Sequence, residues 1–138
     1  MTAMDIGWVT AYDLDWFGKC GQHIAHFATG GTDTMPDVFM QNKELWEKVS
    51  DFCDNLPMQE WEIVICDGNL PYFENDNERE WYLSSFVEMA KKGFYSHYID
   101  FKNLQYKLIT YPIIDVKLPQ AIYDLLPQVD LEKIASPN

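Results

Sequence analysis

The chain has 138 residues, which suits a single domain, and its hydrophobic fraction of 47% supplies a core, so a mainly disordered chain is excluded. Twenty-two acidic against ten basic residues give a formal net charge of −12. Because nucleic acids and anionic membranes are bound by clustered Lys and Arg, we expect neither as a partner. A net negative charge of this size attracts basic proteins, although the acidity also suits a role in solubility alone.

The cysteines and the N-terminal segment predict the compartment. Three cysteines, Cys20, Cys53 and Cys66, show no paired spacing. The first residues lack the basic region and apolar stretch of a secretory signal, and no apolar run has the length of a transmembrane helix. We therefore expect a cytoplasmic protein with reduced thiols.

The first forty residues predict a β-hairpin. The apolar and β-branched stretch 6–17 predicts a strand, 18–22 a turn with two glycines, and 23–29 a second strand. The Gly-, Thr-, Asp- and Pro-containing stretch 30–37 ends the hairpin.

Residues 42–67 predict a helix followed by a strand. Apolar residues recur at helical spacing over 42–57, Asn42 is placed to cap this helix, and Pro57 limits its continuation. Residues over 61–67 alternate, with Trp61, Ile63 and Ile65 at every second position, which predicts a short strand.

A second amphipathic helix is predicted over 77–93. Asn77 and Glu80 have the spacing of a capping box, and Gly93 suits the left-handed residue that ends a helix. Its expected inward face begins with Trp81, which we place in the core together with Trp46 of the first helix.

The last third predicts a second hairpin from strands at 94–100 and 106–111, an extended segment, and a short helix within 118–129 that starts at Pro119. The tail from 130 to 138 is expected to fray. We thus predict one α+β domain over 1–138, with a largely antiparallel sheet built from hairpins, two main amphipathic helices and a short C-terminal helix.

Metal-binding patterns are incomplete in the segment 13–31. Cys20, His23 and His26 are spaced like part of a zinc site, but a fourth ligand is missing, and two histidines three residues apart on a strand point to opposite faces. A partial match to a calcium-binding loop that starts at Asp13 fails at Phe17 and Ile24. We expect no metal and no cofactor.

Catalytic patterns are similarly weak. An acidic setting raises the pKa of a thiol and works against Cys20 as a nucleophile. Asp13 and Asp15, two apart on a strand, share one face and could serve glycoside hydrolysis. We expect no catalytic residue, but a ligand-sized cleft lined by these side chains would favour a small enzyme.

The carboxylates are better candidates for binding a basic partner. Aromatic residues next to acids, as over 67–82, suit an interface with anchoring rings and a charged rim, although a solvated loop explains the same stretch. The predicted contact residues are Asp13, Asp15, Asp33, Asp37, Tyr72, Phe73, Glu74, Asp76, Glu78 and Glu80.

Three segments carry a family resemblance. "DWFGKCGQHIAHFATGG" has the pattern D-W-F, turn, I-A-x-F and T/S-G-G, "AKKGFYSHYID" matches A-x-x-G-[LF]-Y-S, and "YKLITYPIIDVKLP" matches Y-x-L-I-x-x-P followed by L-P. The chain thereby resembles immunity proteins of bacterial polymorphic toxin systems, including those of contact-dependent growth inhibition. The turn "GKCGQ" departs from the usual Asp-, Asn- and Lys-rich turn.

The resemblance implies a cytoplasmic binding protein that neutralises a cognate toxin and is not an enzyme. Many such toxins are nucleases with basic clefts, which an acidic surface could occupy. The alternative is an acidic adaptor or regulator that binds another basic protein.

Overall fold

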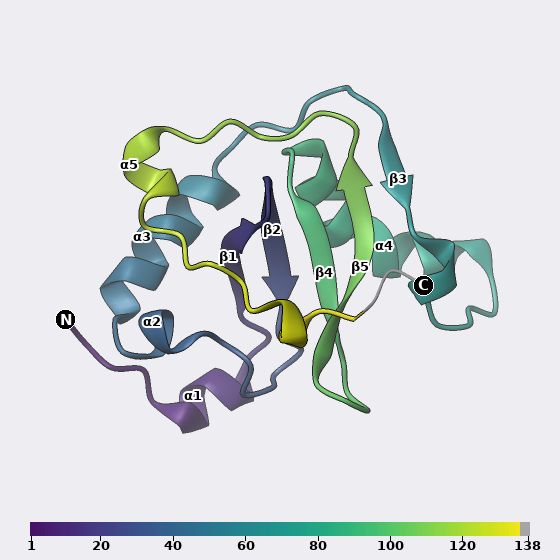
Figure 1. The fold of residues 1–138 in the computed structure, drawn as a ribbon. Coiled ribbons are helices and arrows are strands. Elements are labelled where there is room, and N and C mark those ends of the chain that lie inside the picture. The colour runs from purple at the N-terminus through teal and green to yellow at the C-terminus, as the bar shows by residue number, and fades with distance from the viewer. Residues whose placement is uncertain (136–138) are drawn as a thin grey trace.

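A five-stranded sheet forms the centre of the protein in the computed structural model, which describes residues 1–135 (Figure 1). The strand order is β1-β2-β4-β5-β3, with β2 and β4 parallel and the three other neighbouring pairs antiparallel. This arrangement confirms the α+β class and the two hairpins. The elements are α1 (Ile6–Ala11), β1 (Asp15–Cys20), β2 (His23–Ala28), α2 (Asp37–Met40), α3 (Lys43–Asp54), β3 (Ile63–Ile65), the 3₁₀ turn η1 (Asp67–Asn69), α4 (Asp76–Lys91), β4 (Tyr95–Asp100), β5 (Gln105–Pro112), α5 (Gln120–Tyr123) and the 3₁₀ turn η2 (Leu131–Lys133).

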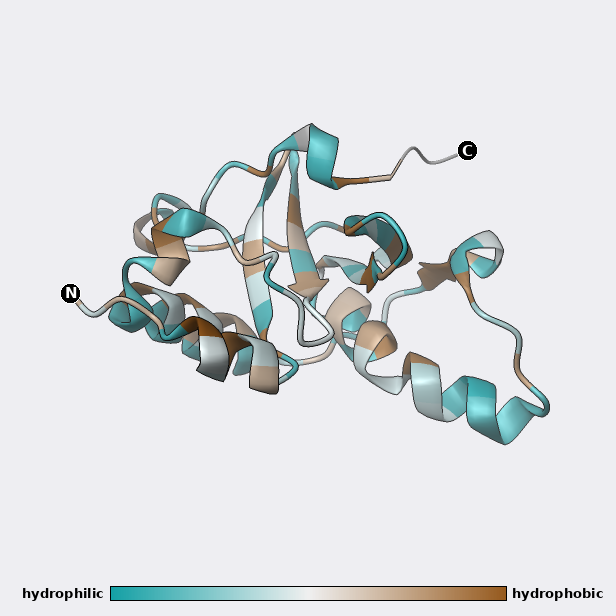
Figure 2. Ribbon diagram, turned by 90° about the horizontal axis from the view of Figure 1, so that it is seen from below, coloured by the Kyte–Doolittle hydropathy of each residue, from teal (hydrophilic) through white to brown (hydrophobic). Residues whose placement is uncertain are grey.

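The two faces of the sheet are covered differently. Helices α3 and α4 lie on one face, and the C-terminal segment crosses the other (Figures 1 and 2). The Thr110 hydroxyl donates to the Phe86 carbonyl of α4 at 2.6 Å, which ties α4 to β5. Lys92, at the end of α4, donates from Nζ to the Asp54 carbonyl of α3 at 2.6 Å and so links the two helices.

The face opposite α4 holds an aromatic stack centred on Phe27. Its ring centroid lies 4.1 Å from that of Trp16, 4.6 Å from His97 and 4.8 Å from Tyr106. All four side chains are buried. Offset and edge-to-face aromatic pairs add to the stabilisation that burial provides, so this stack is a central part of the core.

The predicted strand over 6–17 is wrong in its first half. Residues 6–11 form α1, because the Asp5 carboxylate accepts a hydrogen bond from the Gly7 amide and caps a helix there. Val9 is fully buried on this helix. A short apolar run does not distinguish a strand from a helix, and capping together with the packing of Val9 decides for the helix.

The first hairpin also turns later than predicted. Only Gly21 and Gln22 form the turn, and Gly18 and Cys20 belong to β1. A Cβ atom at Gly18 would lie 2.8 Å from Cγ2 of Val129. Glycine is therefore needed at position 18 for the close approach of the C-terminal segment, not for a turn.

Both main helices are confirmed, with one change of cap. Asn42 caps α3 as predicted, since its side chain accepts from the Leu45 amide at 3.1 Å. For α4 the cap is Asn75, two residues before the predicted Asn77, and it accepts from the Glu78 amide at 2.9 Å. Glu78 in turn accepts from the Glu74 amide, so a reciprocal cap forms in a shifted register.

This register predicts the effect of two neighbouring substitutions. Asn75→Ala should lower the free energy of unfolding by about 1 kcal/mol, because it removes the cap of α4. Asn77→Ala, on the exposed face of the same turn, should change it by less than about 0.5 kcal/mol. Urea unfolding of both variants measures the difference. Equal losses would show that Asn75 does not act as the cap.

The C-terminal predictions need two corrections. The helix predicted over 118–129 is limited to α5, with Pro119 as its N-cap instead of its first residue. The tail does not fray over its described part: the Val129 amide donates to the Lys19 carbonyl at one edge of the sheet, and the Ala135 amide donates to the Tyr106 carbonyl at 2.8 Å. Residues 130–135 are thus held by backbone pairing, and 136–138 lie outside the described residues.

No helix within residues 1–135 is long and apolar enough to cross a membrane.

Candidate partner-binding surface

Asp13 and Asp15 line one open cavity on the face of the sheet that α4 covers. The cavity has a volume of about 360 Å³, and residues from Trp81 to Phe86, in the middle of α4, form its other wall. We call it the acidic pocket; it is lined by Asp13, Asp15, His26, Ala28, Gly30, Trp81, Tyr82, Ser84, Ser85, Phe86 and Tyr98. Asp13 lies before β1 and not on it as predicted, but both carboxylates line this one cavity, which is a ligand-sized cleft.

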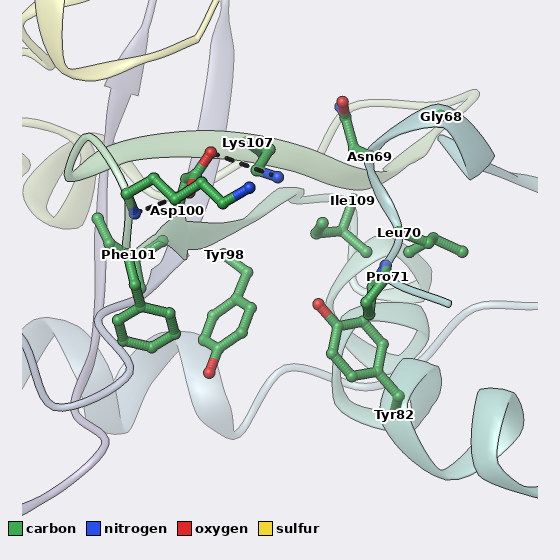
Figure 3. Close-up of a pocket in the computed structure, with 12 residues that line it drawn as sticks. Gly68, Asn69, Leu70, Pro71, Tyr82, Tyr98, Asp100, Phe101, Lys107 and Ile109 are labelled. Atoms are coloured by element: carbon green, nitrogen blue, oxygen red, sulfur yellow. Dashed lines mark hydrogen bonds and ion pairs between the residues drawn. The ribbon is translucent and has the colours of Figure 1, made fainter. Parts of the chain in front are cut away.

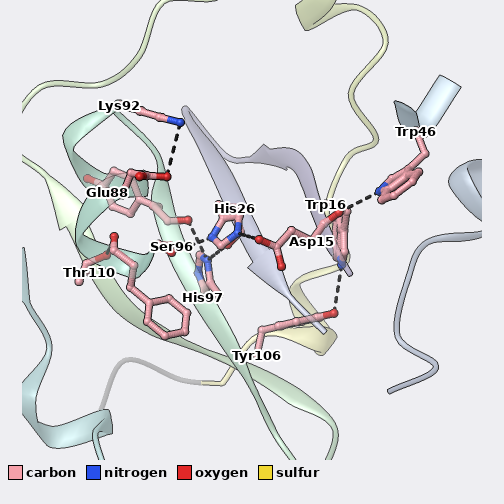
Figure 4. Close-up of polar contacts among 12 residues, drawn as sticks. Asp15, Trp16, His26, Trp46, Glu88, Lys92, Ser96, His97, Tyr106 and Thr110 are labelled. Carbon is pink, nitrogen blue, oxygen red and sulfur yellow. Dashed lines mark hydrogen bonds and ion pairs between the residues drawn. The ribbon is translucent and has the colours of Figure 1, made fainter. Parts of the chain in front are cut away.

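A buried hydrogen-bonded chain stands behind Asp15 (Figure 4). His26 Nε2 lies 2.8 Å from Asp15 Oδ2, and His26 Nδ1 lies 2.7 Å from Ser96 Oγ. Because a carboxylate only accepts, Nε2 donates to Asp15, and in the neutral ring Nδ1 accepts from the Ser96 hydroxyl. The Trp46 indole also donates to the Asp15 carbonyl at 2.8 Å, so both ends of this residue are held.

Ser96, His26 and Asp15 are the residue types of a nucleophilic triad, but in this chain the hydroxyl is the buried end and the carboxylate is the exposed end. Ser96 is fully buried, so its hydroxyl does not face the pocket. Asp15 is the end of the chain that reaches solvent, with 42% of its side chain exposed. The arrangement therefore orients a carboxylate toward the pocket and does not present a nucleophile to a substrate.

Aromatic side chains line the acidic pocket together with the two carboxylates. Tyr82 and Tyr98 lie edge to face with ring centroids 6.2 Å apart. Burial, and secondly Tyr98, raises the pKa of Tyr82 to about 12, and burial followed by the charge of Asp13 raises the pKa of Tyr98. Both phenols are therefore neutral at physiological pH. Trp81 is 81% exposed next to them.

A second cavity, of about 440 Å³, lies on the other side of the Tyr82–Tyr98 pair (Figure 3). It runs between the segment 68–71 and the tip of the β4–β5 hairpin, where Lys107 Nζ lies 3.5 Å from Asp100 Oδ2. Phe101, at the hairpin tip, is exposed at its margin. The two cavities share Tyr82 and Tyr98 as a common wall, and we call them together the α4 groove.

The predicted acids of α4 extend this surface. The N-terminal half of α4 projects away from the sheet and is hydrophilic (Figure 2). Glu74, Asp76, Glu78 and Glu80 are all exposed there. Arg79, the cation of this turn, is paired with Asp67 at 2.6 Å. The end of α4 therefore presents a negative surface beside the groove.

Asp33 and Asp37 do not join this surface. They line a separate cavity of about 440 Å³ together with Trp16 and Tyr106 of the aromatic stack. Successive strand residues point to opposite faces, so Asp15 and Trp16 open onto opposite sides of the sheet. The structure thus divides the predicted contact residues between two faces.

The two predicted aromatic anchors differ in their surroundings. Tyr72 is 88% exposed and free to contact a partner. Phe73 packs on Tyr82 with ring centroids 5.3 Å apart and supports the groove from outside.

Trp81 is the functional candidate that the sequence analysis missed, since it was predicted to lie in the core. At about 100° per residue, Trp81 stands about 140° from Phe86 around the helix, whereas Leu83 and Ala90 lie close to Phe86. These three residues are buried and form the inward stripe. Including Leu83 in the pattern would have placed Trp81 outside the stripe.

The sulfur and imidazole groups do not gather into a reactive site. His23 and His26 point to opposite faces as predicted, and His23 pairs with Asp115 at 3.0 Å. Burial raises the pKa of the Cys20 thiol, which keeps it protonated at neutral pH. Within residues 1–135, no group of three His, Cys, Asp or Glu side chains is placed to hold a metal ion.

No protein-family model, no curated protein and no solved structure matches the chain. A function is therefore inferred from the groove together with the sequence resemblance described above.

Proposed function

We propose that this chain is a cytoplasmic immunity-type protein that binds a basic bacterial toxin domain and neutralises it. The observation that supports this most is the position of Trp81, which is 81% exposed between the acidic pocket and the carboxylates of α4. Exposed tryptophans within a charged rim are the common anchors of protein interfaces.

Two physical effects would act together at this surface. Covering an exposed Trp side chain removes a large apolar area from water, which is worth roughly 1.5–3 kcal/mol for a large hydrophobic side chain. The carboxylates around it would attract a basic partner and raise the rate of encounter. A net charge of −12 adds to this attraction at long range.

The toxin assignment comes from the resemblance of the two hairpins to immunity proteins. A nuclease cleft is built to bind phosphates and is basic, so an acidic surface with an aromatic anchor is suited to fill it. We infer inhibition by binding in preference to catalysis. The Ser96 hydroxyl behind Asp15 is buried, and burial raises the pKa of each thiol, so neither group favours a nucleophilic role; the cleft lined by Asp13 and Asp15 is the feature on which a small enzyme would depend. The second candidate, an adaptor for another basic protein, would use the same surface.

Co-expression with the product of the adjacent gene tests the proposal. We expect this chain to restore the growth of cells that produce the toxin, and the two proteins to co-purify. If cells die equally fast with and without the chain, the immunity function is wrong. Co-purification without protection would instead favour the adaptor.

The location of the surface is tested with two triple variants that remove the same charge. Glu74→Gln, Asp76→Asn and Glu80→Gln together should lower the association rate about tenfold at low salt, since charge near the interface steers encounter. Glu47→Gln, Asp51→Asn and Glu60→Gln, away from the α4 end, should lower it less than about threefold. Equal slowing in both variants would show that only the net charge matters. Glu78 is left intact because it takes part in the cap of α4.

A further inference from the structure

The acidic pocket holds two carboxylates, and the histidine in its lining, His26, is already bound to Oδ2 of Asp15. Its lining holds the carboxylates of Asp13 and Asp15 and, among the described residues, neither lysine nor arginine. The pocket is therefore complementary to a cation supplied from outside the chain.

The Asp15 carboxylate is held in place with part of its accepting capacity unused. His26 occupies Oδ2, and among residues 1–135 no hydrogen bond is made by Oδ1. An ionised carboxylate has about four accepting positions. Because the imidazole is buried and bound to Ser96, Asp15 is oriented in advance, which lowers the cost of ordering it on binding.

The aromatic wall selects among cations. Trp81 and Tyr98 line the same cavity as the two carboxylates. A guanidinium group is planar, stacks on aromatic rings and is more weakly hydrated than an ammonium group. It also bonds carboxylates in a forked geometry, for which two neighbouring acids are suited.

The cavity has the size of a side-chain site. Its volume of about 360 Å³ is at the lower end of ligand pockets, which run roughly from 300 to 1,000 Å³. A cavity of this size suits one long side chain better than a folded segment.

We propose that the acidic pocket receives an arginine side chain of the partner, which stacks on Trp81 and Tyr98 and binds Asp13 and Asp15. This inference rests on the proposed function, because it names the group on the basic partner that the surface recognises.

Peptide titration tests the pocket without the partner. The probes are acetyl-Gly-Arg-Gly-amide and acetyl-Gly-Lys-Gly-amide, added to ¹⁵N-labelled protein. The arginine peptide should shift the Trp81 indole N–H resonance saturably in the millimolar range, at least about threefold more tightly than the lysine peptide. Equal affinity of the two peptides, or shifts that do not saturate, would overturn the inference.

Two variants and a control locate the binding. Asp13→Asn, which lies outside the His26 chain, should weaken the arginine peptide at least about threefold, followed through the backbone amides around Tyr98. Trp81→Ala should weaken binding of the arginine peptide by a similar factor. Because the Trp81 side chain is exposed, we expect this variant to stay folded. Asp33→Asn, in the cavity on the other face, should leave the affinity unchanged. An equal effect of Asp33→Asn would overturn the assignment to the pocket.

The same variants separate this inference from the proposed function. Against the toxin, Asp13→Asn and Trp81→Ala should each weaken affinity about tenfold or more. If the toxin binds and both variants bind it as tightly as the parent chain, the inference is wrong and the proposed function stands. If the arginine peptide binds but the product of the adjacent gene does not, the pocket stands and the proposed function is wrong.

Discussion

Replacing Phe27 with alanine is expected to lower the free energy of unfolding by about 3–5 kcal/mol, the largest effect we predict for a single substitution. Its ring is fully buried and lies 4.1 Å from Trp16 and 4.6 Å from His97. The substitution removes the apolar area of the ring and the aromatic contacts, and leaves a cavity that the paired strands β1, β2 and β4 cannot close. Urea unfolding followed by circular dichroism measures the loss.

Tyr72→Ala is the matched control, since this ring is 88% exposed. We expect a change within about 0.5 kcal/mol. If the slope of the free energy of unfolding against urea concentration is the same in both variants as in the parent chain, the substitution has lowered the stability of the folded state without changing the compactness of the unfolded chain. A loss below about 1 kcal/mol for Phe27→Ala would contradict the placement of this ring at the centre of the core.

Stability is expected to fall on acidification through His97. Burial lowers the pKa of His97 from 6.5 to about 4, and the neighbouring His26 ring lowers it further. Hydrogen bonds from His97 to the carbonyls of His26 and Tyr95 raise it, but burial has the larger effect. Well above pH 6.5 the ring is neutral in both the folded and the unfolded chain, so it does not lower the free energy of unfolding. Between pH 6.5 and 4 only the unfolded chain takes up this proton, so the free energy of unfolding should fall by about 3 kcal/mol.

The contribution of His97 is isolated by comparing the parent chain with His97→Asn, which loses the titrating ring. The variant should be less stable at pH 7 because the stack on Phe27 is broken, but its stability should fall by about 3 kcal/mol less between pH 7 and pH 4. His23→Asn, with a side chain that is partly exposed, should retain most of the parent's pH dependence. A parallel pH profile for His97→Asn and the parent would show that the buried ring does not titrate in this way.

Both predictions concern the layer that positions the groove. Phe27 and His97 lie side by side on β2 and β4, and their neighbours His26 and Ser96 point to the opposite face. The chain from Ser96 through His26 to Asp15 therefore depends on the packing behind it. We expect loss of the aromatic stack to disturb the acidic pocket as well as to destabilise the fold.

Much of the fold could be predicted from local patterns. The helical periodicity over 42–57, the Asn42 cap and Gly93 describe α3 and the end of α4 correctly, and Gly93 has the positive φ of 104° that its position requires. The hairpins follow from β-branched and aromatic runs around short turns. These signals are local because hydrogen bonding and side-chain spacing within a few residues produce them.

Other features depend on contacts that are distant in the sequence. Residues 6–11 contain the same apolar types as a strand, and the burial of Val9 together with the Asp5 cap makes them a helix. Residues 130–135 have little local preference, and backbone pairing with Tyr106 holds them. The Asp5 cap is local, but the burial of Val9 and the pairing of Ala135 with Tyr106 each depend on a partner contributed by another part of the chain.

The sequence by itself determined the strong negative charge, the α+β class, both hairpins, the two main helices and the nearness of Asp13 to Asp15, since these follow from residue types and local spacing. Only the tertiary structure decided that Ser96, seventy positions from His26, completes the chain behind Asp15, and that Asp33 and Asp37 lie on the other face. It also decided that Trp81 stands exposed at the mouth of the acidic pocket. The physical reason is that a site is a meeting of side chains from separate strands and helices, and strand order and helix packing bring them together after local structure has been specified.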